Sequence, residues 1–237
     1  MLLKQSFFLV AILVTTISFA QQTTDRDSIA LQMRYAAKQE LLDKYYPRDI
    51  DTLYGGYLST FTYDFKPSGP QDKMIVTQSR HIWSTANAAI FYKDTSYISM
   101  SRHGFYFLRD KMWDDTYGGF YTLVARDGTV KSTIKEAYGN AFGIYGLSAY
   151  YKCSLDTAAL NLAKKAFMWM EKHSHDPKFK GYYQHLQRDG TPVQRTANIP
   201  GTSDLGYKDQ NSSIHILEAL TELYHVWPDP LVRTRLQ

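Results

Sequence analysis

Apolar residues recur at helical spacing in six stretches of the chain. In residues 27–46 they fall at positions 29, 30, 33, 36, 37, 41 and 42, which is the period of an amphipathic helix. The same test predicts helices over 74–92, 97–113, 134–151, 157–173 and 210–227. Asp156 is a suitable N-cap for the fifth helix, and Pro228 and Pro230 end the sixth.

Three related segments separate these helices. "YGGYLSTFTYDF" begins at Tyr54, "YGGFYTLVARDG" at Tyr117 and "FKGYYQHLQRDG" at Phe179, so the chain repeats with a period of about 62–63 residues. The aligned positions are Gly56, Gly119 and Gly181, followed by Asp64, Asp127 and Asp189. Each copy predicts a β-hairpin with a glycine-led turn and a polar second turn, for which Arg-Asp-Gly is a strong signal.

Helix, hairpin and helix therefore follow one another three times. The helices after the hairpins, 134–151 and 210–227, are apolar on most faces, which indicates burial between neighbours. The helix at 157–173 has a polar side with lysines and a glutamate, as expected of an outer helix. Inner helices surrounded by outer ones predict an all-α fold of the α/α-toroid type, with the hairpins at one end.

Composition limits the possible functions. The chain of 237 residues is 44% hydrophobic and 15% aromatic, which is ample for a packed core and argues against a disordered protein. Its 19 Tyr, 12 Phe and 4 Trp suit a carbohydrate-lined cleft, and an aromatic-rich core explains them equally well. A net charge of +4 without a basic block gives little support to nucleic-acid binding. Cys153 is the only cysteine, so no intrachain disulfide is expected.

The N-terminus, "MLLKQSFFLVAILVTTISFAQQ", has the pattern of a secretory signal peptide. Lys4 precedes an apolar run over 7–19, and Ser18 and Ala20 are the small residues before a cleavage site. We therefore expect residues 1–20 to be removed, leaving 21–237 periplasmic or secreted with no stable membrane anchor. An uncleaved anchor is the alternative, although the apolar run is short for a membrane span.

A polar stripe interrupts the apolar surface of the predicted inner helices. On 210–227 it consists of Asn211, His215, Glu218 and Glu222. Helix 74–92 carries Arg80, Trp83 and Asn87 at similar spacing, and helix 134–151 carries Tyr138, Phe142 and Tyr145, with Asn140 nearby. Most of these residues lie in the first half of their helices, so a toroid gathers them at one end. There, Arg80, Tyr138, His215 and Glu218 are expected to surround one small polar ligand. An exposed His–Glu pair on the surface is the alternative, and the helix pattern alone favours it.

These residues also carry a resemblance. "QSRHIW", "YGGFYTLVARDG", "KEAYGNAFGIYGLSAYY", "EKHSHDP" and "HILEALTELYHVWPDP" resemble the N-acylglucosamine 2-epimerase family, and within it the cellobiose and mannobiose 2-epimerases. The resemblance runs from about residue 30 to residue 237. It implies an (α/α)6 barrel that inverts C2 of a reducing-end aldose, interconverting glucose and mannose. It also implies that the enzyme uses no metal and no cofactor.

The resemblance implies roles for individual residues. His215 is expected to be one of two acid/base histidines, Glu218 its acidic partner, and Arg80 the group that polarises the sugar carbonyl. Tyr138 resembles a tyrosine of the cleft that binds the sugar, the small-molecule partner implied here. The helix pattern, apart from the resemblance, adds Trp83 as a stacking surface and Asn140 as a further residue expected to bind the sugar. The reaction expected is proton removal from C2 to a cis-enediolate and return of a proton to the opposite face.

Two departures from the family pattern stand out. The cellobiose enzymes usually have a further histidine where this chain has Ser213, which puts the exact substrate in doubt. Six repeats need roughly 370 residues, so the chain supplies about half a barrel, and no residue stands for the second catalytic histidine. We expect a truncated N-terminal half, inactive by itself; a half-barrel that closes its ring by dimerising is the alternative.

Two other functions remain open at this stage. A glycoside hydrolase on the same toroid needs two carboxyl groups across the scissile bond, and the candidates are Asp114, Asp115, Glu136 and Glu218. The chain is otherwise a non-catalytic glycan-binding half-barrel that uses its Tyr and Trp surface.

Overall fold

The computed structural model describes residues 25–193, 206 and 208–237, in two compact units, Met1–Arg48 and Asp49–Gln237. The described part of the first unit is one helix, which is α-helical over 25–35, π-helical at Ala36–Leu42 (η1) and α-helical again at Asp43–Tyr45 (α2). The helix predicted over 27–46 is confirmed. The predicted signal peptide, 1–20, lies outside the described residues. Within those residues, no helix is long and apolar enough to span a bilayer.

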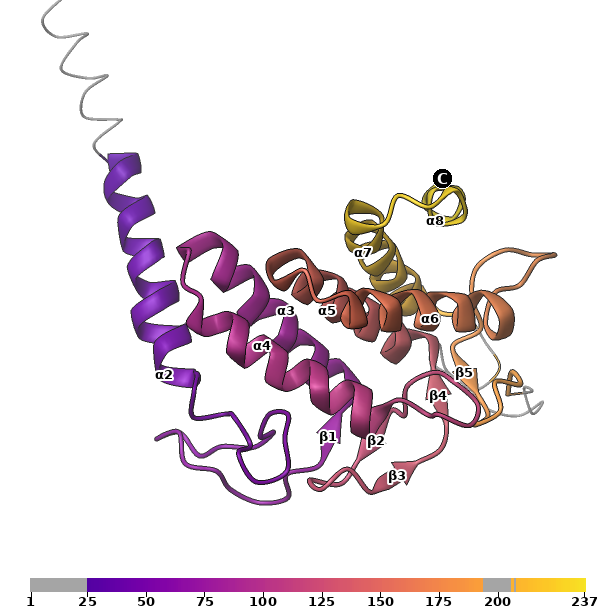
Figure 1. The fold of residues 1–237 in the computed structure, drawn as a ribbon, viewed down its shortest axis with the longest axis horizontal. Coiled ribbons are helices and arrows are strands. Elements are labelled where there is room, and N and C mark those ends of the chain that lie inside the picture. The colour runs from indigo at the N-terminus through magenta and orange to yellow at the C-terminus, as the bar shows by residue number, and fades with distance from the viewer. Residues whose placement is uncertain (1–24, 194–205, 207) are drawn as a thin grey trace, which may run out of the picture. The chain divides into compact units, whose positions relative to one another are not determined.

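The second unit alternates inner and outer helices (Figure 1). The inner helices are α3 (Ile75–Tyr92), α5 (Ala137–Ser154) and α7 (Gln210–Val226). The outer ones are α4 (Ser96–Phe107) with its π-helical continuation η2 (Leu108–Met112), α6 (Thr157–His173) and the short α8 (Pro230–Leu236). The five helices predicted in this unit are all present. The helix expected from residue 134 begins three residues later, because Lys135 and Glu136 form a strand.

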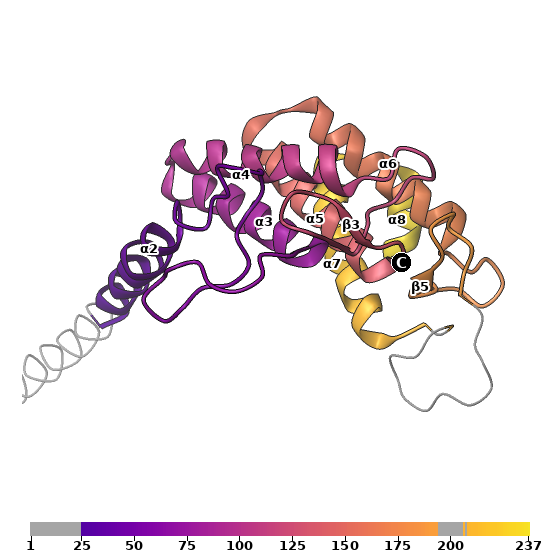
Figure 2. The ribbon, with the colours of Figure 1, turned by 90° about the horizontal axis from the view of Figure 1, so that it is seen from below.

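The central inner helix, α5, is the most deeply buried. Twelve of its 18 residues are buried, and Figures 1 and 2 show α3, α5 and α7 in succession, with α4 and α6 beside them. Two glycines let α5 approach α3 closely. A Cβ at Gly146 would lie 2.7 Å from the carbonyl oxygen of Ser79, and one at Gly139 would lie 2.7 Å from the Ile75 side chain. The predicted division into inner and outer helices is confirmed.

The strands pair between repeats, which differs from the separate hairpins that the sequence predicts. β1 (Lys73–Met74) pairs antiparallel with β2 (Leu123–Val124), which also pairs with β3 (Val130–Ser132). β4 (Lys135–Glu136) pairs with β5 (His185–Leu186). The strands in front of α3 and α5 therefore each join the hairpin of the next repeat. The first copy of the repeat contains only isolated bridges, such as Ile50 with Tyr57.

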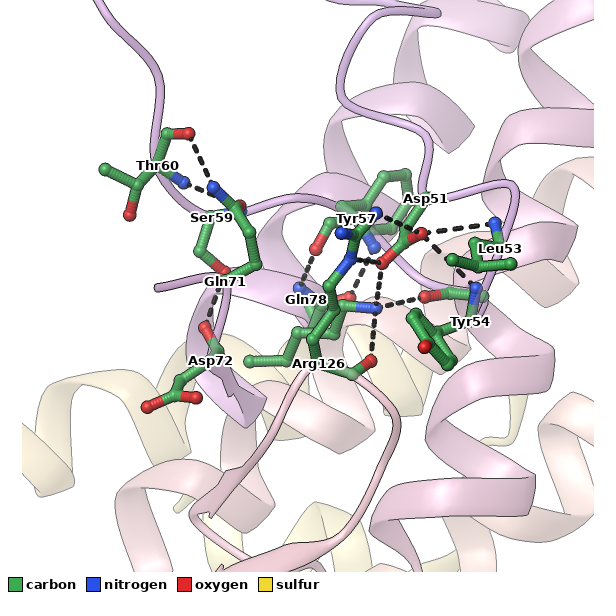
Figure 3. A network of polar contacts seen from close by, with 12 residues as sticks. Asp51, Leu53, Tyr54, Tyr57, Ser59, Thr60, Gln71, Asp72, Gln78 and Arg126 are labelled. Carbon is green, nitrogen blue, oxygen red and sulfur yellow. Dashed lines mark hydrogen bonds and ion pairs between the residues drawn. The ribbon is translucent and has the colours of Figure 1, made fainter. Parts of the chain in front are cut away.

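A buried ionic cluster also crosses the boundary between the first two repeats (Figure 3). The Lys73 Nζ lies 2.9 Å from Asp51 Oδ2 and donates to the Arg126 carbonyl at 2.9 Å. Arg126 reaches back from the second hairpin, and its Nε and Nη2 donate to the two Asp51 oxygens at 2.8 and 3.1 Å. The Asp51 and Lys73 side chains are fully buried. We call this Asp–Lys–Arg arrangement a clasp.

The second and third repeats are joined by the same clasp. Lys135 Nζ lies 3.0 Å from Asp114 Oδ2 and donates to the Arg188 carbonyl at 2.7 Å, while Arg188 Nε donates to Asp114 Oδ2 at 2.9 Å. Burial works to raise the pKa of Asp114, but the hydrogen bonds from Arg188 and Lys135 outweigh it and hold that pKa well below its usual range. The clasps fix the hairpins at the end where the inner helices begin.

Candidate functional site

The candidate site is formed by equivalent positions on the three inner helices. Arg80, Phe142 and His215 are each the sixth residue of their helix, and Trp83, Tyr145 and Glu218 are each the ninth. Because α3, α5 and α7 are neighbours, these positions form two rows across them. In each row, the residue from one repeat lies next to the residue from the following repeat.

The first row joins a cation to the histidine through an aromatic ring. The guanidinium of Arg80 lies 4.6 Å from the centre of the Phe142 ring, and the centre of the His215 ring lies 4.7 Å from that same centre. Tyr138, one turn earlier on α5, meets His215 edge-on at 5.1 Å. The structure therefore brings Arg80, Tyr138 and His215 together around Phe142. The sequence predicts that Arg80, Tyr138 and His215 lie close together.

The second row is an aromatic platform beside carboxylates. Trp83 and Tyr145 stack with ring centres 5.1 Å apart and planes 11° from parallel. Glu222 Oε1 accepts a hydrogen bond from Trp83 Nε1 at 3.4 Å, and its other oxygen is buried with no hydrogen-bond partner among the described residues. Parallel ring faces of this kind suit stacking against the apolar face of a sugar.

His215 and Glu218 form a direct pair. His215 Nδ1 lies 2.7 Å from Glu218 Oε2, with the histidine largely buried and the glutamate half-exposed. A carboxylate on one ring nitrogen fixes the orientation of the imidazole and leaves the other nitrogen for a ligand. His215 is the less exposed member of this pair, because its ring also packs on Phe142 and Tyr138.

The charges of the site act on Tyr145. Burial, together with the negative charges of Glu222 and Glu218, raises the pKa of Tyr145 to about 12 against the opposing effect of Arg80. Tyr145 therefore keeps its hydroxyl proton at neutral pH and can donate a hydrogen bond. Within the described residues, no three His, Cys, Asp or Glu side chains form a metal-ligand group.

Asn140 does not join this cluster, which corrects the prediction that it binds the sugar. Its side chain is fully buried on another face of α5. Oδ1 accepts the Phe120 backbone N–H at 2.9 Å, and Nδ2 donates to the Glu136 carbonyl at 2.9 Å. Asn140 thus anchors the second hairpin to α5 and has no face open to a ligand.

The hydrolase candidates are dispersed. Asp114 is held inside the second clasp, and Asp115 is exposed in the adjoining loop. Burial raises the pKa of Glu136, which precedes α5, and the nearby His185 opposes that rise. Glu218 is paired with His215. Asp114 and Asp115 are consecutive but differ in exposure, and Glu136 and Glu218 lie on other elements, whereas His215 has an acidic partner and an aromatic enclosure.

Sequence analysis alone did not select several of the residues found here. Phe142, Tyr145 and Glu222 have the spacing of the polar stripe, but only their contacts with Arg80, Trp83 and His215 mark them as part of the site. The two clasp arginines were interpreted only as turn residues. Their signal is a lysine just before each inner helix together with an arginine before each Asp-Gly.

Inner and outer helices with hairpins at one end and a polar, aromatic site on the inner helices define an α/α-toroid protein of the (α/α)6-barrel class. Within that class, the chain belongs to the N-acylglucosamine 2-epimerase family: the family model for N-acylglucosamine 2-epimerase (GlcNAc 2-epimerase) matches residues 56–237. The expectation from the resemblance is confirmed for both family and fold.

Individual relatives agree with this assignment. Over 203 residues the chain is 31% identical to a cellobiose 2-epimerase of Ruminococcus albus, covering 84% of this chain and 51% of that protein. The solved cellobiose 2-epimerase of Spirochaeta thermophila matches with a TM-score of 0.80 and 29% identity, over 89% of this chain and 52% of that one. A family 76 glycoside hydrolase (mannosidase) of Bacteroides thetaiotaomicron has a TM-score of 0.65 at 16% identity, which shows a shared fold alone. The chain spans about half the length of these relatives.

Proposed function

We propose that this chain forms half of the active site of a sugar 2-epimerase that acts on the reducing-end glucose or mannose of a β-1,4-linked disaccharide. The observation that carries the proposal is the row Arg80–Phe142–His215, with Glu218 on the imidazole. The names of the relatives support the substrate class, since several are cellobiose 2-epimerases and one is a D-mannose isomerase.

The chemistry uses the residues of the two rows. With the sugar open, the C2–H bond lies next to the C1 aldehyde. When a base takes the C2 proton, the C2–H electron pair forms a double bond between C2 and C1, and the carbonyl electron pair moves onto O1 to give a cis-enediolate. His215 serves as this acid/base because an imidazole can both accept and donate a proton through its ring nitrogens. Arg80 stabilises the negative charge that develops on the sugar oxygens. Glu218 orients His215, and Trp83 with Tyr145 holds the ring.

Inversion at C2 requires protons on both faces of the enediolate. Among the described site residues, His215 is the only histidine, and it serves one face. We therefore expect this chain alone to bind the disaccharide without net epimerisation. A barrel completed by a second half is expected to return the proton to the opposite face.

The test is proton NMR of cellobiose incubated in D2O with the completed barrel, together with sugar binding by the 237-residue chain. Epimerisation with deuterium entering C2 is expected, as is loss of at least about 100-fold in rate for His215→Asn. His225→Asn is the matched control, since His225 lies on α7 but is exposed away from the site. Turnover without deuterium uptake, or equal rates for the two variants, contradicts the proposal. Net epimerisation by this chain alone contradicts the division of the site between two halves.

A further inference from the structure

The third repeat contains the aspartate and the lysine of a clasp, Asp176 and Lys208. Lys208 Nζ lies 2.6 Å from Asp176 Oδ2 and donates to the Lys180 carbonyl at 2.5 Å, as Lys73 and Lys135 do in their repeats. Asp176 Oδ1 accepts the backbone N–H groups of Lys178 and Phe179, and Oδ2 accepts the Tyr183 hydroxyl at 3.0 Å. No described arginine reaches Asp176.

The exposure of the neighbouring groups marks the place of the missing arginine. The side chain of Lys208 is 27% exposed, whereas Lys73 and Lys135 are fully buried. In those complete clasps the ammonium also donates to the carbonyl of the incoming arginine. Lys208 has no such carbonyl within the described part of the chain.

An aromatic ring lies at the same place. In the complete clasps, the guanidinium of Arg126 lies 5.4 Å from the Tyr54 ring, and that of Arg188 lies 5.4 Å from the Tyr117 ring. Phe179 occupies the equivalent position of the third repeat and is 72% exposed, with the Lys178 Nζ 4.8 Å from the centre of its ring. The third repeat thus offers a carboxylate, a lysine donor and a ring face in the arrangement that holds an arginine twice elsewhere.

The adjoining helix face is apolar and uncovered. The fifth residue of the inner helix is buried in α3 (Ser79) and α5 (Ala141), but in α7 it is Ile214, which is 47% exposed. The eighth residue is buried in α3 and α5, whereas Leu217 of α7 is 55% exposed. Next to this face, a groove of about 500 Å³ runs between the third hairpin, α7 and α8, with Tyr182, Ile216, Leu220 and Arg235 among its lining residues.

We propose that this surface docks a fourth helix–hairpin–helix repeat, whose hairpin inserts an arginine next to an Asp-Gly turn into the Asp176–Lys208 site. The interface continues the two inter-repeat interfaces already present, and the positive guanidinium complements the carboxylate. A second copy of this chain lacks the required group, because its first hairpin carries Tyr63 where the later hairpins carry arginine. The inference does not depend on the reaction that the site catalyses.

The test extends the chain by a repeat of its own. Thr157 and Pro230 both begin an outer helix, so a copy of residues 165–237 placed after Gln237 continues α8 in the register of α6 and supplies a second Arg188. A single thiol introduced by Leu217→Cys, in a Cys153→Ser background, reports whether the face is covered. We expect alkylation of this thiol to slow at least tenfold in the extended protein.

A second variant tests whether the arginine of the added repeat is needed for docking. Arg188→Met in the added copy alone is expected to restore most of the labelling rate of the thiol on α7. As a control, a thiol introduced by Leu155→Cys, at an exposed position away from the interface, is expected to label equally in all proteins.

Three outcomes overturn the proposal. The first is equal labelling of the α7 thiol with and without a folded extension. The second is an Arg188→Met change in the added copy that alters nothing. The third is concentration-dependent protection in the unextended chain, which favours a second copy as the occupant. An extension by residues 104–174, which carries Arg126, repeats the test if the first extension does not fold.

Discussion

Removal of the Arg188 guanidinium tests the energetic weight of a clasp. Arg188→Met keeps an unbranched side chain of similar length and deletes the two hydrogen bonds to Asp114, at 2.9 and 3.4 Å. Hydrogen bonds to charged groups contribute about 1.5–3 kcal/mol each. Because the Arg188 side chain is 44% exposed, solvent screens part of this hydrogen-bond energy. In the variant, Asp114 also retains its ion pair with Lys135. We expect the variant to lose about 2 kcal/mol of unfolding free energy.

Urea unfolding followed by circular dichroism measures this loss. With a denaturant slope of about 2 kcal/mol/M, the midpoint falls by about 1 M. Arg109→Met is the matched control, because Arg109 is 45% exposed and also binds an aspartate, Asp110. Asp110 is itself half-exposed, so this surface pair contributes about 0–1 kcal/mol.

The comparison isolates the burial of the carboxylate as the cause. If Arg188→Met and Arg109→Met shift the midpoint equally, the clasp is an ordinary surface pair, and the reasoning about inter-repeat joining is wrong. Lys135→Met extends the series, because both members of the Lys135–Asp114 pair are buried and loss of one partner then costs about 3–5 kcal/mol. The expected order of destabilisation is Lys135, Arg188 and then Arg109.

Three further predictions concern acid, packing and the aromatic platform. The folded-state pKa of Asp114 lies below its unfolded value of about 3.8. The ionised Asp114 therefore stabilises the fold fully above about pH 3.8, and this stabilisation is lost as the pH falls below that value. In Asp114→Asn, the unfolding midpoint should fall less steeply as the solution is acidified. Gly146→Ala should loosen α5 from α3, because the added Cβ meets the backbone of Ser79. The Trp83–Tyr145 stacking should weaken as a result, which tryptophan fluorescence would show. Gly139→Ala should have a smaller effect, because its added Cβ meets only the movable Ile75 side chain. Trp83→Leu should weaken disaccharide binding by calorimetry about threefold to tenfold, and unchanged affinity would remove the platform from the site.

Local patterns explain what the sequence could predict. The helices were predictable because their apolar period depends only on neighbouring residues, and α5 and α7 were recognisable as inner helices by their lack of a charged face. Strand pairing was not, because β1 and β4 are two residues long and find their partners in the next repeat. A two-residue strand carries no periodic signal, and its partner is chosen by the packing of whole repeats.

The site was predictable in part. The stripe on α7 and the motif around Arg80 identified the residues that meet at Phe142, but contact across helices depends on the alignment of one repeat with the next. Arg126 and Arg188 show the limit clearly. An arginine before Asp-Gly satisfies a turn pattern whether it points into solvent or into a buried carboxylate, so the local sequence cannot distinguish the two.

Comparison of equivalent positions separates structural from functional residues in this repeat. The fourth residue of the inner helix is Gln78 in α3 and Asn140 in α5, and each amide oxygen accepts the backbone N–H of the aromatic residue in its own hairpin. The same chemistry in two repeats indicates a structural role. The sixth residue is instead a cation in α3, an aromatic ring in α5 and a histidine in α7. Identical backbone positions with unlike side chains indicate one asymmetric ligand touched from several directions, and this contrast explains why Asn140 belongs to the scaffold and His215 to the site.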